Sequence, residues 1–562
     1  MHIKRIKKGG RVYLAEYESY RDEDGKVKTR YIRYIGTEGD DYKVSKPKKS
    51  SKQVIYPERS YRSGDVTVLW QLAKELGLVQ VIDQVCCGSS GTHGISPGKL
   101  LVSWAINRAI DPESTSQMED WIRTTDLPSL MQIPAHEFSK DALLSALDFV
   151  CSYNPKSGRI VDNSPQLDEN LYQRWRASYP LPPGTNEIVA YDLTSVLLYG
   201  DTCPLSEKGY NPPESRLNQV NLTVLASRYD QYPLAHLVYA GNRQSISTVR
   251  NLLLRLDDMG IVPGTIVWDR GNTSQETIEA VELRRWNLLC GIPKVSDEAK
   301  EIVAATDVPL EPRYLVPTSD VGEIYAVKID RQIFGRPGAV VVYTNIGKKG
   351  RDVKRRNAAL FNIGNELDAL KEKVYPAQVI AEAEVKEMVN GWTRFFKFSY
   401  HVEEKGYRFH WVYDEAAIES ASRLDGKWIL YASNHELSAR DIVISYFEKD
   451  FIEKLFRCLK TDEEIAPVRH RLEYRVRAYF FVCMLALRLR LALKARLHYM
   501  RVKDKPSVDI FLKILGRVER AESIVGEEKI SIYLNVSLDL RKYLRSLKML
   551  DLFPDAPKSV VG

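Results

Sequence analysis

The sequence predicts an α/β protein of several domains. Residues 186–295 alternate between short apolar β-rich runs and amphipathic stretches, in the order strand, strand, strand, helix, strand, helix, strand. Residues 62–180 show helical apolar spacing instead, for example in Val66–Gly77 and Gly98–Ala109. A chain of 562 residues, 44% of them hydrophobic, is long enough for about two to four domains with buried cores.

Composition excludes several classes of protein. The net charge of +7 is only mildly basic, which is compatible with nucleic acid but does not require it. Seven cysteines without a C-x2-C pair indicate reduced thiols, and the nine histidines show no metal-ligand spacing. The first residues lack the apolar segment of a secretory signal, and the longest apolar run, Ala478–Leu487, is too short to span a bilayer and predicts a buried helix. We therefore expect a cytoplasmic protein without membrane contact, associated with the nucleoid when bound to DNA.

The N-terminal region predicts three segments before the first core strand. Residues 11–20 and 26–36 alternate around Asp24-Gly25, which indicates a β-hairpin within residues 1–42, either a DNA-facing sheet or a plain cap. Residues 43–61 begin with five lysines and Pro47, typical of a basic linker. The helical region 62–180 ends at the Pro-rich boundary 180–185.

Two aspartates lie within or directly after apolar strands, at positions where a strand with only a structural role would not be expected to have a carboxylate. Asp192 interrupts the apolar run from Ile188 to Tyr199, and desolvating an unpaired carboxylate costs several kcal/mol or shifts its pKa. Asp269 ends a four-residue apolar strand, and Thr273–Glu276 then predicts a capping box. Open α/β sheets place their chemistry at the carboxyl ends of strands. Each aspartate, taken singly, is equally open to a structural interpretation.

A third acid lies on a predicted helix from Tyr446 to Lys460. At 100° per residue, one stripe about 80° wide contains a single carboxylate, a phenol and three cations. These are Tyr446, Lys449, Glu453, Arg457 and Lys460. A single acid among side chains that bind phosphate suggests a metal ligand positioned next to bound nucleic acid. The alternative is a solvent-exposed helix face on which these residues form i,i+4 ion pairs.

The 183 residues between Asp269 and Glu453 exceed one crossover, so we expect an insertion over 296–424, with core segments at 181–295 and 425–500. Its early part predicts strands at 323–329 and 339–343, followed by a long polar helix to about residue 390. Six basic residues lie at the start of that helix and would either bind phosphates or form a solvent-exposed first part of the helix. They are Lys348, Lys349, Arg351, Lys354, Arg355 and Arg356. Trp392 and the phenylalanines 395, 396 and 398 suggest core packing or a wedge for a flipped base. Residues 501–562 predict a C-terminal helical region, with a helix over Leu534–Leu552 for dimerisation or docking.

Together, Asp192, Asp269 and Glu453 make the chain resemble the DDE transposases of bacterial and archaeal insertion sequences. The segment around Glu453 reads Y-x2-K-x3-E-x6-K, similar to the group whose third motif is Y-x2-R-x3-E-x6-K. Flanking blocks occur in the family's order, over about residues 185–490: Gly241-Asn242, Asp425–Asn434, Pro467–His470 and Arg475–Phe480. Lys449 replaces the family's arginine, which keeps the charge but loses bidentate binding to a phosphate.

The resemblance implies a fold, a reaction and partners. It implies a ribonuclease H-like core in which Asp192, Asp269 and Glu453 are the catalytic residues and hold two Mg²⁺ ions, with Mn²⁺ able to substitute. Tyr446, Lys449, Arg457 and Lys460 would bind DNA phosphates. The substrates would be double-stranded DNA, namely the terminal inverted repeats of the element, bound by the helical region 62–180, and the target DNA. A homodimer on DNA is expected.

Two other functions belong to different classes. The same core could be a DNA nuclease without strand transfer, which the large insertion and the helical N-terminal region disfavour. It could also be a catalytically inactive DNA-binding descendant of a transposase, which retention of all three acids disfavours.

Overall fold

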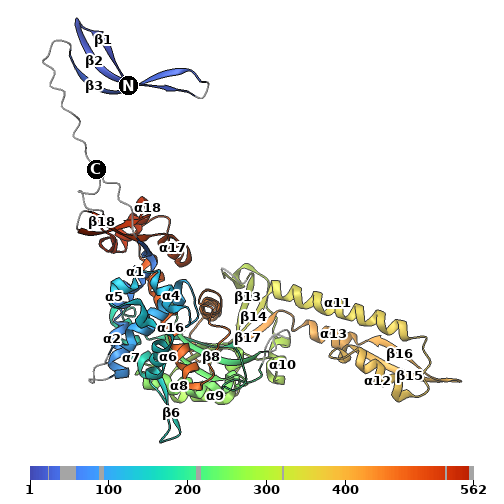
Figure 1. Cartoon of the computed structure of the whole chain (residues 1–562). Helices are drawn as coiled ribbons and strands as arrows, with labels where there is room; N and C mark the ends of the chain where they lie inside the picture. Colours follow the sequence, from blue (N-terminus) through green and yellow to red (C-terminus); the bar gives the residue numbers. More distant parts are fainter. Residues whose placement is uncertain are drawn as a thin grey trace. The chain divides into compact units, whose positions relative to one another are not determined.

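The computed structural model describes residues 1–22, 25–37, 59–87, 94–209, 217–318, 322–525 and 528–555. The chain is a mixed α/β protein with two compact units (Figure 1). One comprises residues 1–57, 523–530 and 555–562, and the other residues 58–522 and 531–554. The expected basic linker lies outside the described residues, except at 59–61, which begin strand β4 (Arg59–Arg62).

The first unit contains an antiparallel sheet at the N-terminus. Its strands are β1 (His2–Lys8), β2 (Arg11–Arg21) and β3 (Val27–Thr37), in the order β1-β2-β3. The predicted hairpin is thus confirmed, with β1 as an additional strand. Gly25 in its turn has φ +78°, which glycine adopts without strain. Tyr31 and Tyr34 are exposed.

The second unit begins with β4 and a helical layer, as predicted for residues 62–180. Its helices are α1 (Gly64–Glu75), α2 (Leu78–Cys87), α3 (Pro97–Ile110), α4 (Met118–Arg123), α5 (Leu127–Met131), α6 (Lys140–Val150) and α7 (Ser164–Ser178). A hairpin of β5 (Cys151–Asn154) and β6 (Arg159–Asp162) interrupts them. Four-residue strands are too short for a periodic signal, so the sequence did not reveal this hairpin.

Helix α16 (Glu473–His498) runs through this layer and contains the apolar run that predicted a buried helix. It packs on α1, α3, α6 and β9 (Pro233–Ala240), and its residues from Phe480 to Leu487 are fully buried. A helix that is apolar on all sides belongs in a core. Among the described residues, no helix combines the length and apolar character needed to cross a membrane.

A nine-stranded sheet forms the centre of the second unit. Residues 186–295 supply the expected order of elements: β7 (Ile188–Leu198), β8 (Asn218–Ser227), β9, α8 (Val249–Asp258), β10 (Thr265–Trp268), α9 (Gln275–Leu283) and β11 (Asn287–Ile292). In the sheet these strands lie in the order β9-β8-β7-β10-β11. The β7–β8 and β8–β9 pairs are antiparallel, and β10 is parallel to both β7 and β11. The capping box of α9 is Ser274 with Thr277, one residue later than predicted.

The same sheet continues beyond β11 with antiparallel strands. These are β17 (Lys427–Ala432), β14 (Ala339–Asn345), β13 (Ile324–Ile329) and β12 (Leu315–Val316). Strands β13 and β14 were expected inside the insertion. They instead extend the sheet that carries Asp192 and Asp269, with β17 between β14 and β11.

A helical extension follows β14 and has a core of its own (Figure 1). It contains α11 (Ile346–Leu370), α12 (Gln378–Met388), the strands β15 (Phe396–Glu403) and β16 (Gly406–Tyr413), and α13 (Glu415–Ser422). The single helix expected to reach residue 390 is therefore wrong, because α11 ends at Leu370. Phe395 and Phe396 are buried in this core and Trp392 and Phe398 pack against it, which confirms core packing.

The C-terminal region is not purely helical, so that prediction is wrong. Its elements are α17 (Val508–Leu515), β18 (Glu519–Val525), β19 (Glu528–Leu534) and α18 (Leu538–Ser546). Residues Glu519–Glu522 of β18 pair antiparallel with β4, more than 450 residues earlier in the chain. The expected helix over Leu534–Leu552 is reduced to α18.

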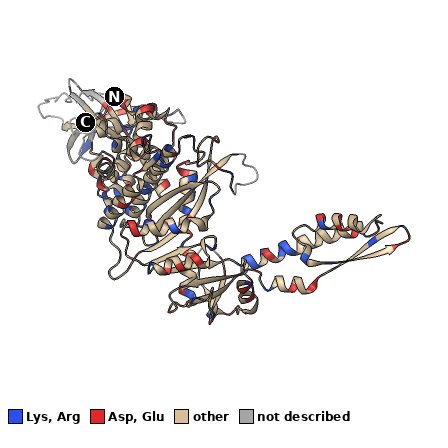
Figure 2. Cartoon of the chain, turned by 90° about the horizontal axis from the view of Figure 1, so that it is seen from below, with Lys and Arg blue, Asp and Glu red and all other residues tan. Residues whose placement is uncertain are grey.

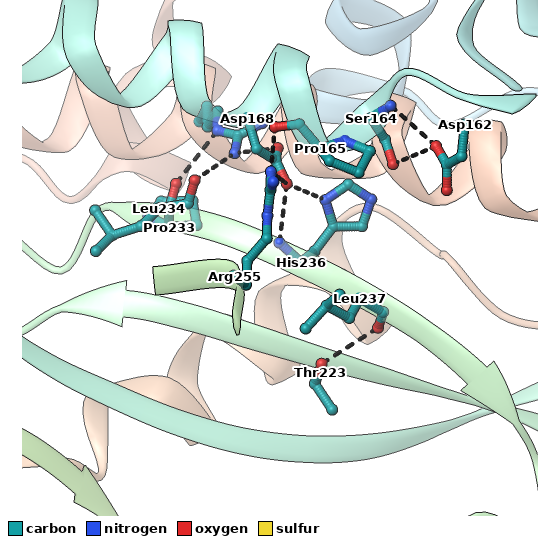
Figure 3. Close-up of polar contacts among 11 residues, drawn as sticks. Asp162, Ser164, Pro165, Asp168, Thr223, Pro233, Leu234, His236, Leu237 and Arg255 are labelled. Atoms are coloured by element: carbon teal, nitrogen blue, oxygen red, sulfur yellow. Dashed lines mark hydrogen bonds and ion pairs between the residues drawn. The ribbon is translucent and has the colours of Figure 1, made fainter. Parts of the chain in front are cut away.

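A cluster of buried charges joins the helical layer to the sheet (Figure 3). The carboxylate of Asp168, on α7, accepts hydrogen bonds from the backbone N–H of His236 (3.0 Å) and from Arg488 on α16 (2.7 Å), and His236 Nδ1 lies 2.9 Å away. Arg255 of α8 is 3.9 Å from the same carboxylate. Burial raises the pKa of Asp168, but His236 and Arg488 outweigh that effect and hold it well below its ordinary value.

Candidate active site

Asp192 and Asp269 occupy neighbouring positions on two parallel strands, with Asp192 inside β7 and Asp269 directly after the last residue of β10. Tyr191 of β7 is paired with Trp268 of β10, so the residues that follow them occupy neighbouring positions. Side chains alternate between the faces of a sheet. The hydroxyl of Tyr191 contacts Thr248, beside α8, whereas Ile188 packs on the opposite face against the core that includes α14 (Ala439–Glu448). Four residues after Ile188, Asp192 shares the α14 face.

Asp269 lies on that same face, and a tyrosine of α14 holds it. Its Oδ1 accepts hydrogen bonds from the hydroxyl of Tyr446 (2.5 Å) and from the backbone N–H of Arg270 (2.8 Å). Tyr446 is buried rather than presented to solvent. A Cβ atom at Gly291, on the adjacent strand β11, would come within 2.7 Å of the Tyr446 hydroxyl oxygen, so the glycine leaves room for this contact.

The helix predicted from Tyr446 to Lys460 is broken, which corrects the sequence prediction. Helix α14 ends at Glu448, α15 spans Phe451–Arg457, and a π-helical turn covers Cys458–Asp462. The break at residues 449–450 separates Tyr446 from the rest of the predicted stripe. Tyr446 is buried against the sheet, whereas Glu453, Arg457 and Lys460 are exposed.

The break places Lys449 among the acids. The side chain of Lys449 is only 11% exposed, its ammonium lies 3.9 Å from Asp450 Oδ1 and 4.8 Å from the ring centre of Tyr446, and its charge lowers the pKa values of Asp192, Asp269 and Asp450. A cation in this position offsets the repulsion between neighbouring carboxylates. The residue that replaces the family's arginine therefore lies within the acidic cluster.

The two aspartates differ in acidity. Burial raises the pKa of Asp192 to about 6, although the Leu193 N–H and Lys449 oppose this, and the charges of Asp269 and Glu453 add to it. Burial also raises the pKa of Asp269, but Lys449, the hydrogen bond from Tyr446 and the Arg270 N–H together bring it below its ordinary value. These couplings place Asp192 within electrostatic reach of both other predicted catalytic acids.

Glu453 and Asp192 both line an open pocket of about 450 Å³. Helix α15 packs against β7, and the pocket is lined by Asp192, Leu193, Thr194, Glu453, Phe456, Arg457, Lys460 and Thr461. Burial lowers the pKa of Lys460. Two of the predicted phosphate-binding cations, Arg457 and Lys460, thus lie in the same pocket as two of the three predicted catalytic acids.

The chemistry of this cluster suits a hard divalent cation. Its donors are carboxylate oxygens, the ligands that magnesium prefers, and Lys449 already places a positive charge among them. Within the described part of the chain, no three His, Cys, Asp or Glu side chains are close enough together to form a complete metal site. The donor types fit magnesium.

Asp450 is a member of the cluster that the sequence interpretation missed. Burial raises its pKa, and the charges of Glu453 and Asp269 act in the same direction. On a continuous helix Asp450 would lie about 40° from Tyr446, beside the predicted stripe. A signal was therefore present, but only the residues within the stripe were interpreted.

The predicted DNA-binding residues of α11 lie in the first half of the helix, where Lys and Arg are concentrated (Figure 2), but they differ in exposure. Arg356 is buried and binds Asp425 through two hydrogen bonds of 2.7 Å, so its prediction as a DNA-binding residue is wrong. Lys348 is half-buried and pairs with Asp352 at 3.1 Å. The remaining four are exposed: Lys349, Arg351, Lys354 and Arg355.

Comparison with known proteins finds little similarity. No family model matches the chain, and no curated protein matches it. A solved structure of a piggyBac transposase synaptic complex with hairpin DNA is similar with a TM-score of 0.37 and 11% sequence identity, over 88% of this chain and 86% of that one. At this level the likeness assigns neither a fold nor a function, so the proposals below rest on the residues of this chain.

Proposed function

We propose that this protein is a DDE transposase of an insertion sequence, which cleaves DNA at the ends of the element and joins them to target DNA. One observation carries the proposal. Asp192 and Asp269 occupy neighbouring positions on one face of the sheet, and Glu453 shares a pocket with Asp192 and two cations. These are the three acids that the sequence motif singled out, from segments as far as 261 residues apart.

The catalytic core is proposed to be ribonuclease H-like. The antiparallel β7-β8-β9 meander, followed by the parallel strands β10 and β11 on the other side of β7, supports this proposal. In such an arrangement the first and fourth strands are adjacent, which brings the acids of β7 and β10 together. Strands β12–β14 and β17 widen the sheet, and α11–α13 form an extension from it.

Asp192, Asp269 and Glu453 would hold magnesium, with Mn²⁺ able to substitute. When bound, two such ions activate the attacking oxygen and stabilise the leaving oxygen during in-line displacement at phosphorus. Lys449 offsets the repulsion among the carboxylates, and the Tyr446 hydroxyl fixes the orientation of Asp269. Arg457 and Lys460 face the pocket and would hold the DNA phosphates on either side of the cleaved bond.

The two reaction steps exchange one P–O bond for another. Water attacks the phosphorus at the end of the element, and the 3′-oxygen leaves and takes up a proton. The freed 3′-hydroxyl then loses its proton and attacks a target phosphodiester, whose own 3′-oxygen leaves. No covalent enzyme intermediate is required, so the chain needs no nucleophilic side chain in the pocket.

Double-stranded DNA is the proposed partner, as both terminal repeats and target, and the proposed assembly is a homodimer on DNA. The exposed cations of α11 support a long contact with a polyanion, because a contact confined to the catalytic pocket would not require them. Lys349, Arg351, Lys354 and Arg355 are proposed to bind phosphates outside that pocket.

Alanine substitution of each acid tests the proposal. We expect Asp192→Ala, Asp269→Ala and Glu453→Ala each to lower cleavage and joining by more than about 100-fold, since even outer-shell changes at metal sites cost 10- to 100-fold. DNA binding should survive, because binding depends on the cations. Labelled duplex ends in magnesium buffer, resolved on gels, measure cleavage and joining. Asp297→Ala, at a fully exposed acid on α10 (Asp297–Ala305), is the matched control.

The same assay distinguishes the alternative functions. Joined products support a transposase, and cleavage without joining supports a nuclease. Tight binding without any product indicates an inactive DNA-binding protein. Wild-type turnover in any of the three variants would refute the assignment of that acid.

A further inference from the structure

A second pocket lies away from the catalytic acids and has a volume of about 720 Å³. Two segments provide most of its wall, namely residues 112–117 after α3 and residues 464–475 after the π-helical turn. Trp104 and Arg108 of α3 and Lys140 of α6 also line it. The proposed reaction assigns no role to these residues.

Two buried donors that line the pocket lack acceptors. The indole Nε1 of Trp104 and the Nε of Arg108 are enclosed without a hydrogen-bond partner, in side chains 2% and 6% exposed. Both groups can only donate hydrogen bonds, and a buried unpaired donor costs about 1–3 kcal/mol. Arg108 also donates hydrogen bonds through Nη2 to the backbone carbonyls of Glu463 and Glu464, which holds its charge directly behind the wall of the pocket.

The charges that line the pocket favour an anion. The lining contains five cations and two carboxylates, namely Lys140, Arg108, Arg469, Arg471 and Arg475 against Glu113 and Glu464. Arg475 is neutralised by Asp148 through hydrogen bonds of 2.8 and 2.7 Å. Burial, aided by Arg475, lowers the pKa of His470 to about 4, so this residue adds no charge at neutral pH.

Three of the lining cations remain available to a ligand. Among the described residues, Lys140, Arg469 and Arg471 form no ion pair, and all three are exposed at the protein surface. The guanidinium of Arg469 lies 5.5 Å from the ring centre of Tyr199, which sets its position without neutralising it. The pocket therefore combines two buried donors with exposed cations, an arrangement suited to a phosphate group.

The pocket is connected to the strand that carries Asp192. Val468 pairs with Leu198 at the end of β7, with hydrogen bonds of 2.9 and 2.8 Å to its neighbours. Six residues of extended strand from Asp192 to Leu198 span about 20 Å. That distance matches about six base pairs of duplex at 3.4 Å each. A duplex that runs along β7 from the catalytic acids would extend as far as this segment.

We propose that the pocket between α3 and residues 464–475 binds a backbone phosphate of DNA, about six base pairs from the bond that is cleaved. The choice of DNA as the source of the phosphate rests on the proposed function, whereas the phosphate chemistry rests on the pocket itself. Arg469, Arg471 and Lys140 bind the phosphate oxygens at the pocket surface, and the buried charge of Arg108 behind the wall adds to the attraction.

Arg471→Gln in the full-length protein tests the proposal. Duplex binding is measured by fluorescence anisotropy over a range of salt concentrations. We expect the Kd to rise several-fold and the slope of log K against log salt to fall by about 0.9, the value for one lost phosphate contact. Arg285→Gln, at an exposed arginine beside the opposite ends of the parallel strands, is the control and should change neither quantity.

Replacing single DNA phosphates by uncharged groups identifies the phosphate that the pocket binds. Duplexes carrying one methylphosphonate, moved stepwise along each strand, should show one position about six base pairs from the cut where wild-type affinity falls. Arg471→Gln should lose nothing further there. If Arg471→Gln binds duplex like the wild type and no such position exists, the pocket is not a DNA site.

An experiment with inorganic phosphate distinguishes a DNA backbone phosphate from a free phosphate as the occupant of the pocket. Its effect on the melting temperature is compared for wild type and Arg471→Gln at constant ionic strength. Stabilisation of the wild type alone, with unchanged duplex binding by the variant, would overturn DNA as the occupant in favour of a free phosphate. If the wild type bound no duplex at all, the proposed function would fail and DNA would fail with it as the occupant. An unchanged Kd for the variant, when the wild type does bind duplex, would refute the pocket proposal alone.

Discussion

At the scale of single residues, the site depends on how burial and hydrogen bonds set the acidity of each carboxyl group. Asp192 has few compensating contacts, so burial dominates and its pKa rises to about 6. Asp269 is equally part of the sheet, but Lys449 and the Tyr446 hydroxyl bring its pKa below the ordinary value. Two acids at neighbouring positions of the sheet thereby have different acidities.

Tyr446→Phe should raise the pKa of Asp269, because the hydrogen bond that favours the carboxylate is lost. A carboxylate with a higher pKa becomes protonated at a higher pH, so the acid limb of the pH–rate profile of DNA cleavage should move upward. The plateau at higher pH should change little. Tyr499→Phe, at an exposed tyrosine, is the control. An unshifted acid limb would show that Tyr446 does not tune Asp269.

Glu463 offers a test of pH-dependent stability away from the site. It is fully buried, and burial raises its pKa from 4.5 to about 8 despite the nearby Arg490 and Arg108. The unfolded carboxyl ionises first as pH rises, so its stabilising contribution is complete below 4.5 and is lost progressively up to about 8. Each unit of difference corresponds to about 1.4 kcal/mol.

Glu463→Gln should remove this pH dependence. Urea unfolding at pH 5, 6.5 and 8 should show that the free energy of unfolding of the wild type decreases with pH more steeply than that of the variant. The variant should be the more stable of the two at pH 8. Parallel curves for the two proteins would mean that Glu463 is ionised in the folded state at neutral pH.

At the scale of elements, the break between α14 and α15 decides where the third acid lies. An unbroken helix would keep Tyr446 and Glu453 on one exposed stripe. The break allows Tyr446 to turn into the sheet toward Asp269 while Glu453 stays in the pocket beside Asp192. Lys449 lies at the break, between Tyr446 and Glu453 in the chain. Its side chain is largely buried, and its ammonium lies 3.9 Å from Asp450 Oδ1.

Helix α11 shows how one element can contain a buried, structural arginine and an exposed arginine side by side. Arg356→Ala would leave Asp425 buried without its partner, which should destabilise the protein by about 3–5 kcal/mol. Arg355→Ala, one residue earlier and exposed, should leave stability unchanged and weaken DNA binding. Denaturant unfolding and anisotropy measure the two effects. Equal stability of the two variants would contradict the assignment of Arg356.

At the scale of the whole second unit, the charges around Asp168 hold the helical layer on the sheet. Asp168 comes from α7, His236 from β9 and Arg488 from α16, and all three are buried. Disrupting such a cluster destabilises the protein, because removing one charged partner leaves the opposite charge buried and uncompensated. The sheet edge next to the helical layer is thereby kept in place relative to the acids of β7 and β10.

Asp168→Asn should destabilise the protein by about 3–5 kcal/mol, since Arg488 would remain buried without a carboxylate. Asp297→Asn, at an exposed acid, should have no measurable effect. Chemical denaturation measures both. The double variant Asp168→Leu with Arg488→Met should recover most of the loss, because it removes both charges together. Failure of that recovery would show that the cluster acts through hydrogen bonds to neutral groups as well.

Several features could be predicted from the sequence because they depend on local patterns. The strand containing Asp192, the short strand before Asp269 and the buried helix containing Ala478–Leu487 all follow from apolar periodicity. The order of elements over residues 186–295 also fixes which strands can be neighbours. The proximity of Asp192 and Asp269 was expected from the resemblance to DDE transposases and not from that order.

Other features depend on contacts between distant segments, which a local pattern does not record. Arg356 reads as one of six surface cations until Asp425, 69 residues later, buries it. Strand β18 reads as part of a charged helical tail until β4 pairs with it. Asp450 is recognised as part of the acidic cluster only once the fold brings Asp269 near it.

The sequence alone determined the mixed α/β class, the order of the strands around the acids, and the identity of three acids worth testing. The tertiary structure alone decided which cations remain exposed, that β12–β14 extend the central sheet, and that Trp104 and Arg108 line a cationic pocket with unpaired donors. The physical reason is the range of the interactions. Periodicity and capping act within a few residues, whereas burial, ion pairing and pKa depend on neighbours that only the folded chain brings together.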